Sequence, residues 1–332
     1  MNESFYVQWH ILDRCNLRCA HCYQYQFSKE RELDWSLLQK VADNLLEAMG
    51  TWNVKLDVAL TGGEPFLKPE LLPLLRYLDK SPHIGDLSII SNGTIFPEYA
   101  QELTGLFHFR EMRISLDGIT AETNDSIRGK GDFEKVLGNI NKWNALHIPV
   151  TIMFTAMKRN KHEIPGLIEF GKRNGIHRVV VERFFPIGQG ETISSDVLTG
   201  QEFLETWNNV LDQIGMEASP EELIPYRALC IDLSEEEIDV LGSGCVVAND
   251  GMAILPAGDV LPCRRFTLPI GNLLETSLPD IWEHSPVLNA LKDKRHLKGK
   301  CGSCNVTDCM GCRAMCLSLK GDYLAEDPHC WI

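Results

Sequence analysis

The first two thirds of the chain alternate between short apolar runs and longer amphipathic segments. Apolar runs of strand length that are bounded by turn residues predict β-strands. The predicted strands are residues 5–12, 54–60, 86–91, 111–116, 148–155 and 177–183. Apolar residues at helical spacing predict helices between them, at about 34–49, 69–80, 97–106, 133–146 and 162–173. Asp34 and Pro69 are typical helix starts, and Gly50 is a typical helix stop.

This alternation predicts an α/β fold with parallel strands, whose chemistry lies at the carboxyl ends of the strands. The pattern weakens after residue 184, where we expect a connection, a helix near 200–214 and an acidic stretch without clear periodicity. Ser234 to Asp239 read as a solvated charge run. We therefore expect three segments: a core over 1–184, a connecting segment over 185–244 and a cysteine-rich module over 245–332.

Composition narrows the class of protein. The formal net charge of −14 argues against a nucleic-acid partner, because phosphate binding requires a basic surface. No apolar run is long enough to span a membrane, and the N-terminus lacks the pattern of a signal peptide. Twelve cysteines, many in clustered spacings, then indicate metal binding in a cytoplasmic protein rather than a disulfide scaffold.

Three cysteines directly follow the first predicted strand. Cys15, Cys19 and Cys22 are spaced so that one short loop can hold three corners of a 4Fe-4S cube. The next cysteine along the chain is Cys230, so the fourth iron is expected to stay open for a substrate or cofactor. The alternatives are a structural zinc loop or three unrelated thiols.

With Tyr23 behind it, this run resembles the CxxxCxxC signature of the radical S-adenosylmethionine (radical SAM) superfamily. The resemblance implies that the open iron chelates the methionine part of S-adenosylmethionine. Reductive cleavage then gives a 5′-deoxyadenosyl radical that abstracts hydrogen from the substrate. It also implies a partial (β/α)6 TIM barrel, open on one side. Tyr23 is expected either to stack on adenine or to pack in the core.

Two further loops at strand ends fit the same family. Gly62, Gly63 and Glu64 follow the second strand and resemble its GGEP motif, whose backbone and acid hold the cofactor's ammonium group. Ser91 and Asn92 follow the third strand and resemble a loop that binds ribose hydroxyls.

The fourth strand is followed by Ser115 and Asp117, which resemble a second ribose-binding loop. Arg128 lies in a segment that resembles one whose arginine pairs with the cofactor's carboxylate. The plainer alternative for Asp117 and Arg128 is a salt bridge between loops.

The C-terminal module contains a second group of cysteines. Read alone, the spacing from Cys301 to Cys312 would predict a zinc ribbon. The wider order of GDVLPC, GCRAM, GDY and EDPHC instead resembles the SPASM extension, which binds auxiliary 4Fe-4S clusters. Matched by position, this resemblance implies a distal cluster on Cys301, Cys304, Cys309 and Cys330, and a proximal one on Cys245, Cys263 and Cys312. Three 4Fe-4S clusters are expected in all.

The proximal site departs from the fuller family pattern. Gly251 stands about where a further cysteine is common. Either Cys230 or Cys316 supplies the fourth ligand, or one iron is open to substrate. Cys316 is alternatively a buried apolar thiol, and Cys230 a hydrogen-atom donor.

These resemblances imply an oxidoreductase that modifies a ribosomally made peptide, for example by a crosslink or a thioether. The alternatives are a tetrapyrrole propionate decarboxylase or lactonase of haem pathways, and a non-catalytic electron-transfer protein. An electron carrier would not need the loops at successive strand ends. Arg264 and Arg265 stand where relatives that oxidise sulfatases carry an acidic base, which argues against that activity. They suit an acidic peptide or a propionate, or are simply solvated.

The expected partners follow from the same family. The N-terminus is too short for a winged-helix recognition domain, so a peptide substrate would need a separate recognition protein or direct docking. A reductant such as flavodoxin or ferredoxin is also expected.

Overall fold

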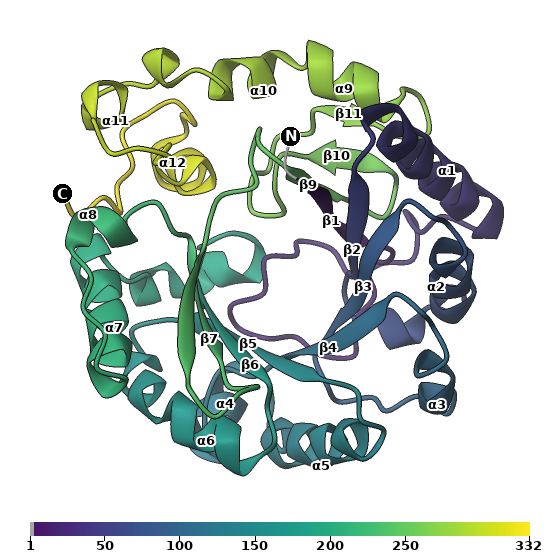
Figure 1. Cartoon of the computed structure of the whole chain (residues 1–332), viewed down its shortest axis with the longest axis horizontal. Helices are drawn as coiled ribbons and strands as arrows, with labels where there is room; N and C mark the ends of the chain where they lie inside the picture. The colour runs from purple at the N-terminus through teal and green to yellow at the C-terminus, as the bar shows by residue number, and fades with distance from the viewer. Residues whose placement is uncertain (1–2) are drawn as a thin grey trace.

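A computed structural model describes residues 3–332 and places their strands in a single mixed sheet (Figure 1). Its order, β11-β10-β9-β1-β2-β3-β4-β5-β6-β7-β8, is linear, so the barrel stays open. The six predicted strands are confirmed as a parallel series: β1 (Ser4–His10), β2 (Lys55–Thr61), β3 (Ile84–Ser91), β4 (Phe109–Ser115), β5 (Val150–Ala156) and β6 (Arg178–Arg183).

Helices cover the outside of these strands (Figure 1). They are α1 (Trp35–Trp52), α2 (Leu71–Asp79), α3 (Ala100–Leu103), α4 (Ala121–Ile127), α5 (Asp132–Ala145) and α6 (Leu167–Arg173), with 3₁₀ helices η1 (Pro65–Leu67) and η2 (Lys161–Gly166). The sequence analysis missed α4. Within residues 3–332, no helix combines the length and apolar composition that a membrane crossing requires.

The ends of α1 show which local signals decide a boundary. Asp34 caps the helix as predicted, because its side chain accepts a hydrogen bond from the Leu37 amide at 3.0 Å. Gly50 does not stop it. The helix continues to Trp52, and Asn53 ends it in the left-handed conformation with φ of 55°. Pro69 likewise precedes α2, which begins at Leu71.

The connecting segment continues the sheet, which the sequence analysis did not foresee. It contains η3 (Gly188–Asp196), α7 (Gly200–Gln213), α8 (Pro220–Leu223), β7 (Ala228–Asp232) and β8 (Asp239–Ser243). The helix α7 is confirmed, whereas β7 and β8 form an antiparallel hairpin beside β6. The predicted charge run lies at the exposed turn of this hairpin.

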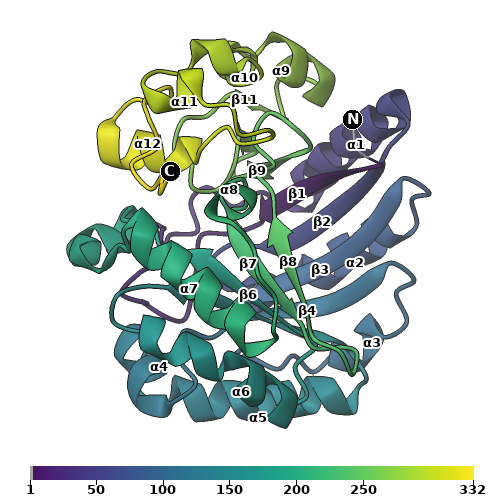
Figure 2. The same cartoon turned by 60° about the vertical axis from the view of Figure 1, so that its left-hand side comes forward.

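The cysteine-rich module adds to the other edge of the sheet, where β9 (Gly251–Ile254) pairs in parallel with β1. Its remaining elements are β10 (Asp259–Leu261), β11 (Gly271–Asn272), α9 (Leu278–His284), α10 (Pro286–Leu291), η4 (Lys294–His296), α11 (Lys300–Ser303) and α12 (Arg313–Lys320). Figure 2 shows these C-terminal helices gathered at one end of the barrel. The sheet therefore runs through all three expected segments.

The strands separate a dry outer face from a polar interior. In β1, Phe5, Val7 and Trp9 are buried in the main core, while Tyr6 and Gln8 line the interior cavity. Side chains of a strand alternate between its two faces, so the polar residues of these strands point into the barrel.

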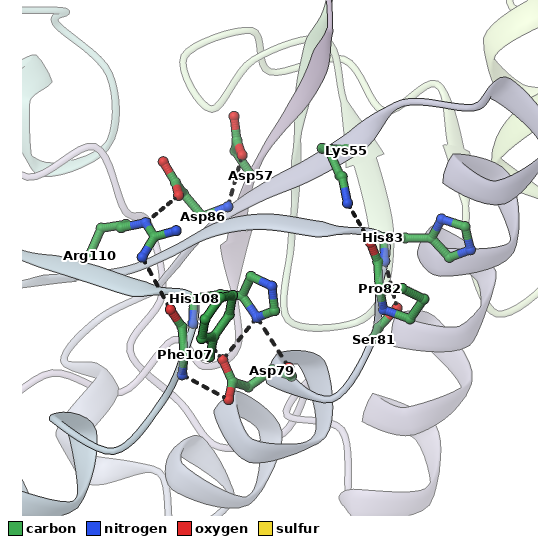
Figure 3. Close-up of polar contacts among 10 residues, drawn as sticks. All are labelled: Lys55, Asp57, Asp79, Ser81, Pro82, His83, Asp86, Phe107, His108 and Arg110. Atoms are coloured by element: carbon green, nitrogen blue, oxygen red, sulfur yellow. Dashed lines mark hydrogen bonds and ion pairs between the residues drawn. The ribbon is translucent and has the colours of Figure 1, made fainter.

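The loops at the amino ends of β3 and β4 are held by polar contacts among themselves (Figure 3). Asp79 at the end of α2 accepts hydrogen bonds from the amides of Phe107 and His108, at 3.1 and 2.7 Å. Arg110 pairs with Asp86 at 2.6 Å. Asp79, Asp86 and Arg110 at this end of the barrel are therefore all paired with protein groups.

Candidate active site

One cavity of about 550 Å³ inside the barrel brings together residues from both ends of the chain. Cysteines from the N-terminal loop, from β7 and from the C-terminal module all line it. These are Cys15, Cys19, Cys22, Cys230, Cys245, Cys263 and Cys312. The sheet topology explains why N-terminal and C-terminal cysteines share this cavity. Strand β1, which precedes the N-terminal cysteine loop, pairs with β9 of the cysteine-rich module.

The N-terminal cysteine loop is shaped by its own backbone. The Cys22 amide donates to the Cys19 carbonyl at 3.1 Å, and the Leu17 amide donates to the Cys15 sulfur at 3.4 Å. Burial raises the pKa of all three thiols, that of Cys19 to about 12, so a bound metal is needed to hold them as thiolates. Three thiols of one loop on one cavity fit a cluster that has three protein ligands.

Gly62 and Gly63 line the cavity and also pack against the residues before Cys15. The Gly63 amide donates to the Leu12 carbonyl at 3.0 Å. A Cβ at Gly62, whose φ is 146°, would lie 2.2 Å from the Leu12 oxygen, and one at Gly63 would lie 2.0 Å from the Arg14 oxygen. Only glycine fits this close approach of two backbones, which fixes the second strand's loop against the cysteine loop.

Glu64 is fully buried and is not among the residues that line the cavity. Its carboxylate accepts hydrogen bonds from the Ser91 hydroxyl and the Asn92 amide, both at 2.9 Å. Burial raises the pKa of Glu64 to about 7. Glu64 thus joins the second and third loops, and its predicted contact with the cofactor stays a prediction. Ser91 and Asn92 do line the cavity.

Asp117 is also fully buried, and it ties the cysteine loop to α4. It contacts Arg128 at 2.7 Å and His21 at 3.0 Å, and it accepts from the Thr155 amide at 2.7 Å. Although burial acts to raise it, the pKa of Asp117 is held at about 2, chiefly by the charge of Arg128. The salt bridge between loops is therefore present. Arg128 still lines the cavity, as does Ser115, whereas Asp117 does not.

Tyr23 lines the cavity between two other side chains. Its ring meets His10 edge-on at 5.8 Å, and the guanidinium of Arg264 lies 4.3 Å from its centre. Burial raises its pKa to about 12. Stacking of Tyr23 on adenine stays a prediction.

The C-terminal cysteines differ in whether they line the cavity. Cys245, Cys263 and Cys312 line the cavity, and the four expected distal ligands do not. Asp327 links the groups, because its carboxylate accepts from the Cys312 amide at 2.6 Å while its own amide donates to the Cys301 sulfur at 3.4 Å.

Over residues 3–332, no three His, Cys, Asp or Glu side chains converge closely enough to hold one metal ion. Thiolates of a cube each bind a different iron, whereas zinc ligands must converge on one ion. Thiols are the ligands of iron-sulfur clusters, and Cys15, Cys19 and Cys22 all line the same cavity.

The two candidates for the fourth proximal ligand lie in different surroundings: Cys230 lines the cavity, and the Cys316 amide donates to the Cys312 carbonyl at 3.0 Å. Cys316 is completely buried in α12 and does not line the cavity. Cys230 does line it, but the charges that act on Cys230 come chiefly from the barrel residues Arg178, Asp232 and Glu111.

The sequence analysis missed most of the cavity's arginines. Eight line it: Arg113, Arg128, Arg178, Arg183, Arg227, Arg264, Arg265 and Arg313. Within residues 3–332, every arginine with a buried nitrogen that lacks a hydrogen-bond partner belongs to this set. Alternation offered a signal, since Glu111, Arg113 and Ser115 of β4 occupy every second position and all face the cavity.

An open parallel barrel whose three-cysteine loop and second cysteine group share one cavity defines an iron-sulfur enzyme of the radical type. The chain belongs to the radical SAM superfamily. The family model of that name matches residues 9–171, and the SPASM model, an iron-sulfur cluster-binding domain, matches residues 245–305. The protein is thus a radical SAM enzyme that binds a 4Fe-4S cluster and S-adenosylmethionine.

Its relatives extend over the whole chain. It is 28% identical to an AdoMet-dependent heme synthase of Methanosarcina barkeri, over 99% of this chain and 97% of that protein. It is 27% identical to the mycofactocin maturase MftC of Mycobacterium tuberculosis, over 98% of this chain and 82% of that protein. The crystal structure of Streptococcus suis SuiB bound to precursor peptide SuiA matches with a TM-score of 0.74 at 18% identity, over 100% of this chain and 77% of that one, which shows the shared fold.

Proposed function

We propose that this enzyme oxidatively decarboxylates propionate side chains of a tetrapyrrole, the second of the functions considered from the sequence. The observation that carries the proposal is the set of cavity arginines with unpaired buried nitrogens. Buried donors without partners are costly, so their presence here favours a ligand rich in carboxylates. The full-length similarity to heme synthases supports the same choice.

The chemistry would be divided between the bound groups and the chain. When bound, S-adenosylmethionine and its cluster on Cys15, Cys19 and Cys22 would supply a 5′-deoxyadenosyl radical, and auxiliary clusters would accept one electron. Overall, each propionate loses one hydrogen atom, carbon dioxide and one electron, and becomes a vinyl group. The chain's own residues bind the carboxylates and exclude water from the reacting carbon.

Arg264 is the best placed residue for a substrate carboxylate. It follows Cys263 directly, and its charge also acts on Cys22, so it lies between the two cysteine groups of the cavity. Its Nε is buried without a partner. Arg265 beside it is instead paired with Glu182. A free guanidinium edge can bind a carboxylate through two parallel hydrogen bonds.

The second candidate function is the oxidative modification of a ribosomally made peptide. It is favoured by the mycofactocin maturase relative, which covers 98% of this chain. Acidic side chains or the C-terminal carboxylate of a peptide would use the same arginines. A separate recognition protein and a reductant such as flavodoxin or ferredoxin belong to this proposal as well.

The test is an anaerobic assay with reconstituted enzyme, S-adenosylmethionine and dithionite. An iron tetrapyrrole bearing propionates, its propionate methyl esters, and acidic and neutral peptides are each supplied as substrate. We expect 5′-deoxyadenosine and loss of carbon dioxide only with the free propionates. Turnover of a peptide without turnover of the tetrapyrrole would replace the first candidate by the second.

We also propose three 4Fe-4S clusters, with the proximal one open to substrate at one iron. Reconstituted protein should hold about twelve irons, four for each cube. Cys230→Ala and Cys316→Ala should each retain all of them. Loss of about four irons in either variant would identify that cysteine as the missing ligand. It would also rule out the open site.

A further inference from the structure

Two arginines contact sulfur atoms of the distal cysteine group. Nη2 of Arg313 lies 3.4 Å from the Cys301 sulfur, and Nη2 of Arg227 lies 3.6 Å from the Cys309 sulfur. Both sulfurs belong to expected ligands of the distal cluster. The site therefore has a guanidinium on each of two ligands.

Other contacts hold both guanidinium groups in place. Arg313 is only 1% exposed, and its Nη1 donates to the carbonyls of Tyr323 at 3.1 Å and Ala325 at 2.8 Å. Nη1 of Arg227 donates to the Ile224 carbonyl at 3.1 Å. Backbone acceptors on Nη1 thus leave Nη2 of each arginine directed at a sulfur, without further reorganisation.

Such donors act on the charge of a thiolate-ligated cluster. Reduction adds one electron to a group that is already negative, and hydrogen bonds from a cation to the ligand sulfurs stabilise the added charge. The reduction potential of an iron-sulfur cluster rises accordingly. This effect requires proximity to sulfur, which Arg227 and Arg313 have and the exposed Arg295 of the same module lacks.

We propose that Arg227 and Arg313 raise the reduction potential of the distal auxiliary cluster. The cluster is then a better electron acceptor than it would be without the two arginines. The step is the uptake of one electron by the oxidised cluster, from dithionite in the test, and no bond forms or breaks. The inference rests on the ligand assignment of the proposed function, namely Cys301, Cys304, Cys309 and Cys330. It does not depend on the identity of the substrate.

The experiment uses full-length protein in which Cys15, Cys19 and Cys22 are replaced by Ala, so that only auxiliary clusters contribute signals. Redox titration followed by electron paramagnetic resonance gives each midpoint potential. Arg227→Gln should lower one midpoint by about 59 mV, a tenfold change in the ratio of reduced to oxidised cluster. Arg227→Lys should give a smaller shift, and Arg295→Gln should give none.

Each other outcome has a defined meaning. Unchanged midpoints in Arg227→Gln, with iron retained, would overturn the role of Arg227. If Arg227→Gln loses iron, then Arg227→Lys and Arg313→Lys decide, and unshifted midpoints in both overturn the inference. If Cys304→Ala loses no iron, the ligand assignment fails and the inference fails with it. The tetrapyrrole assay of the proposed function can still succeed in that case.

Discussion

The two ends of the barrel treat their charged side chains differently. At the amino ends of β3 and β4, Asp79 binds two loop amides, and Asp86 pairs with Arg110. At the carboxyl ends, Arg264 and Arg183 line the cavity, and each has at least one buried nitrogen without a hydrogen-bond partner. The charges named at the first end are paired with protein groups, whereas the second end combines paired charges, such as Asp117 with Arg128, with arginine nitrogens that have no partner.

The difference identifies which polar residues are structural. Folded proteins pair nearly all buried polar groups, so a cluster of unpaired ones in a single cavity points to a missing partner of opposite charge. Under the proposed ligand assignment, part of that partner would be the auxiliary clusters, since Arg227 and Arg313 contact the sulfurs of Cys309 and Cys301. The guanidinium of Arg264 instead lies over the Tyr23 ring with Nε unpaired, and we propose that it binds the substrate.

The largest effect is expected at the carboxyl ends of the strands, from replacing Cys15, Cys19 and Cys22 together by Ala. Formation of 5′-deoxyadenosine under dithionite should fall to background, because nothing then holds the cluster that binds the cofactor. Auxiliary iron should remain. Continued cleavage of S-adenosylmethionine by this variant would refute the assignment of the loop.

Asp117→Asn should show that the carboxyl ends of the strands also contain a structural ion pair, that of Asp117 with Arg128. Loss of the carboxylate leaves Arg128 buried without its counter-ion, so we expect destabilisation of about 3–5 kcal/mol in chemical denaturation. Asp86→Asn is the matched control, since its partner Arg110 is exposed and the pair contributes about 0–1 kcal/mol. Equal effects of the two variants would remove this distinction.

The same pair predicts a dependence on pH. The pKa of Asp117 is about 2 in the folded protein, below its ordinary value of 3.8. Its contribution to stability is therefore complete above pH 3.8 and is lost as the pH falls through about 2. The free energy of unfolding of the wild-type protein, measured by urea titration, should fall as the pH is lowered over this range. Its difference from that of Asp117→Asn should become smaller at the same time.

Asp79→Ala tests whether the contacts at the amino ends of the strands stabilise the fold without affecting the active site. It removes the hydrogen bonds to the amides of Phe107 and His108 and the contact with Nδ1 of His108, so the free energy of unfolding should fall by about 1–3 kcal/mol. Production of 5′-deoxyadenosine per folded enzyme should not change. A substantial loss of turnover in folded Asp79→Ala would show that this end is coupled to the active site.

The parallel core could be predicted because each of its strands is a short apolar run between helix-like segments. The hairpin of β7 and β8 could not, because its burial depends on pairing with β6, a contact distant in sequence. The glycines of the second loop were expected to hold the cofactor, and that role stays a prediction. Their neighbour, however, is the backbone at Leu12 and Arg14 as well as the cavity.

The cysteines were visible from their spacing, and most of the cavity's arginines were not. Arg113, Arg178 and Arg227 are far apart in sequence, and only the three-dimensional fold brings them to one cavity. Arg264 and Arg265 were noted beside Cys263, but no local pattern shows that one is paired with Glu182 and the other has a free nitrogen. Side-chain pairing across a cavity requires the fold.

The most direct test of the account is the affinity of the reconstituted enzyme for a propionate-bearing tetrapyrrole, measured for wild type, Arg264→Gln and Arg110→Gln. We expect Arg264→Gln to weaken binding by about 10- to 100-fold, because it removes a charge-assisted hydrogen bond in a buried site. Arg110→Gln, at the opposite end of the strands, should bind like wild type, and propionate esters should bind all three proteins equally weakly. Unchanged affinity in Arg264→Gln, or tight binding of the esters by wild type, would contradict the claim that the unpaired arginine binds substrate carboxylates.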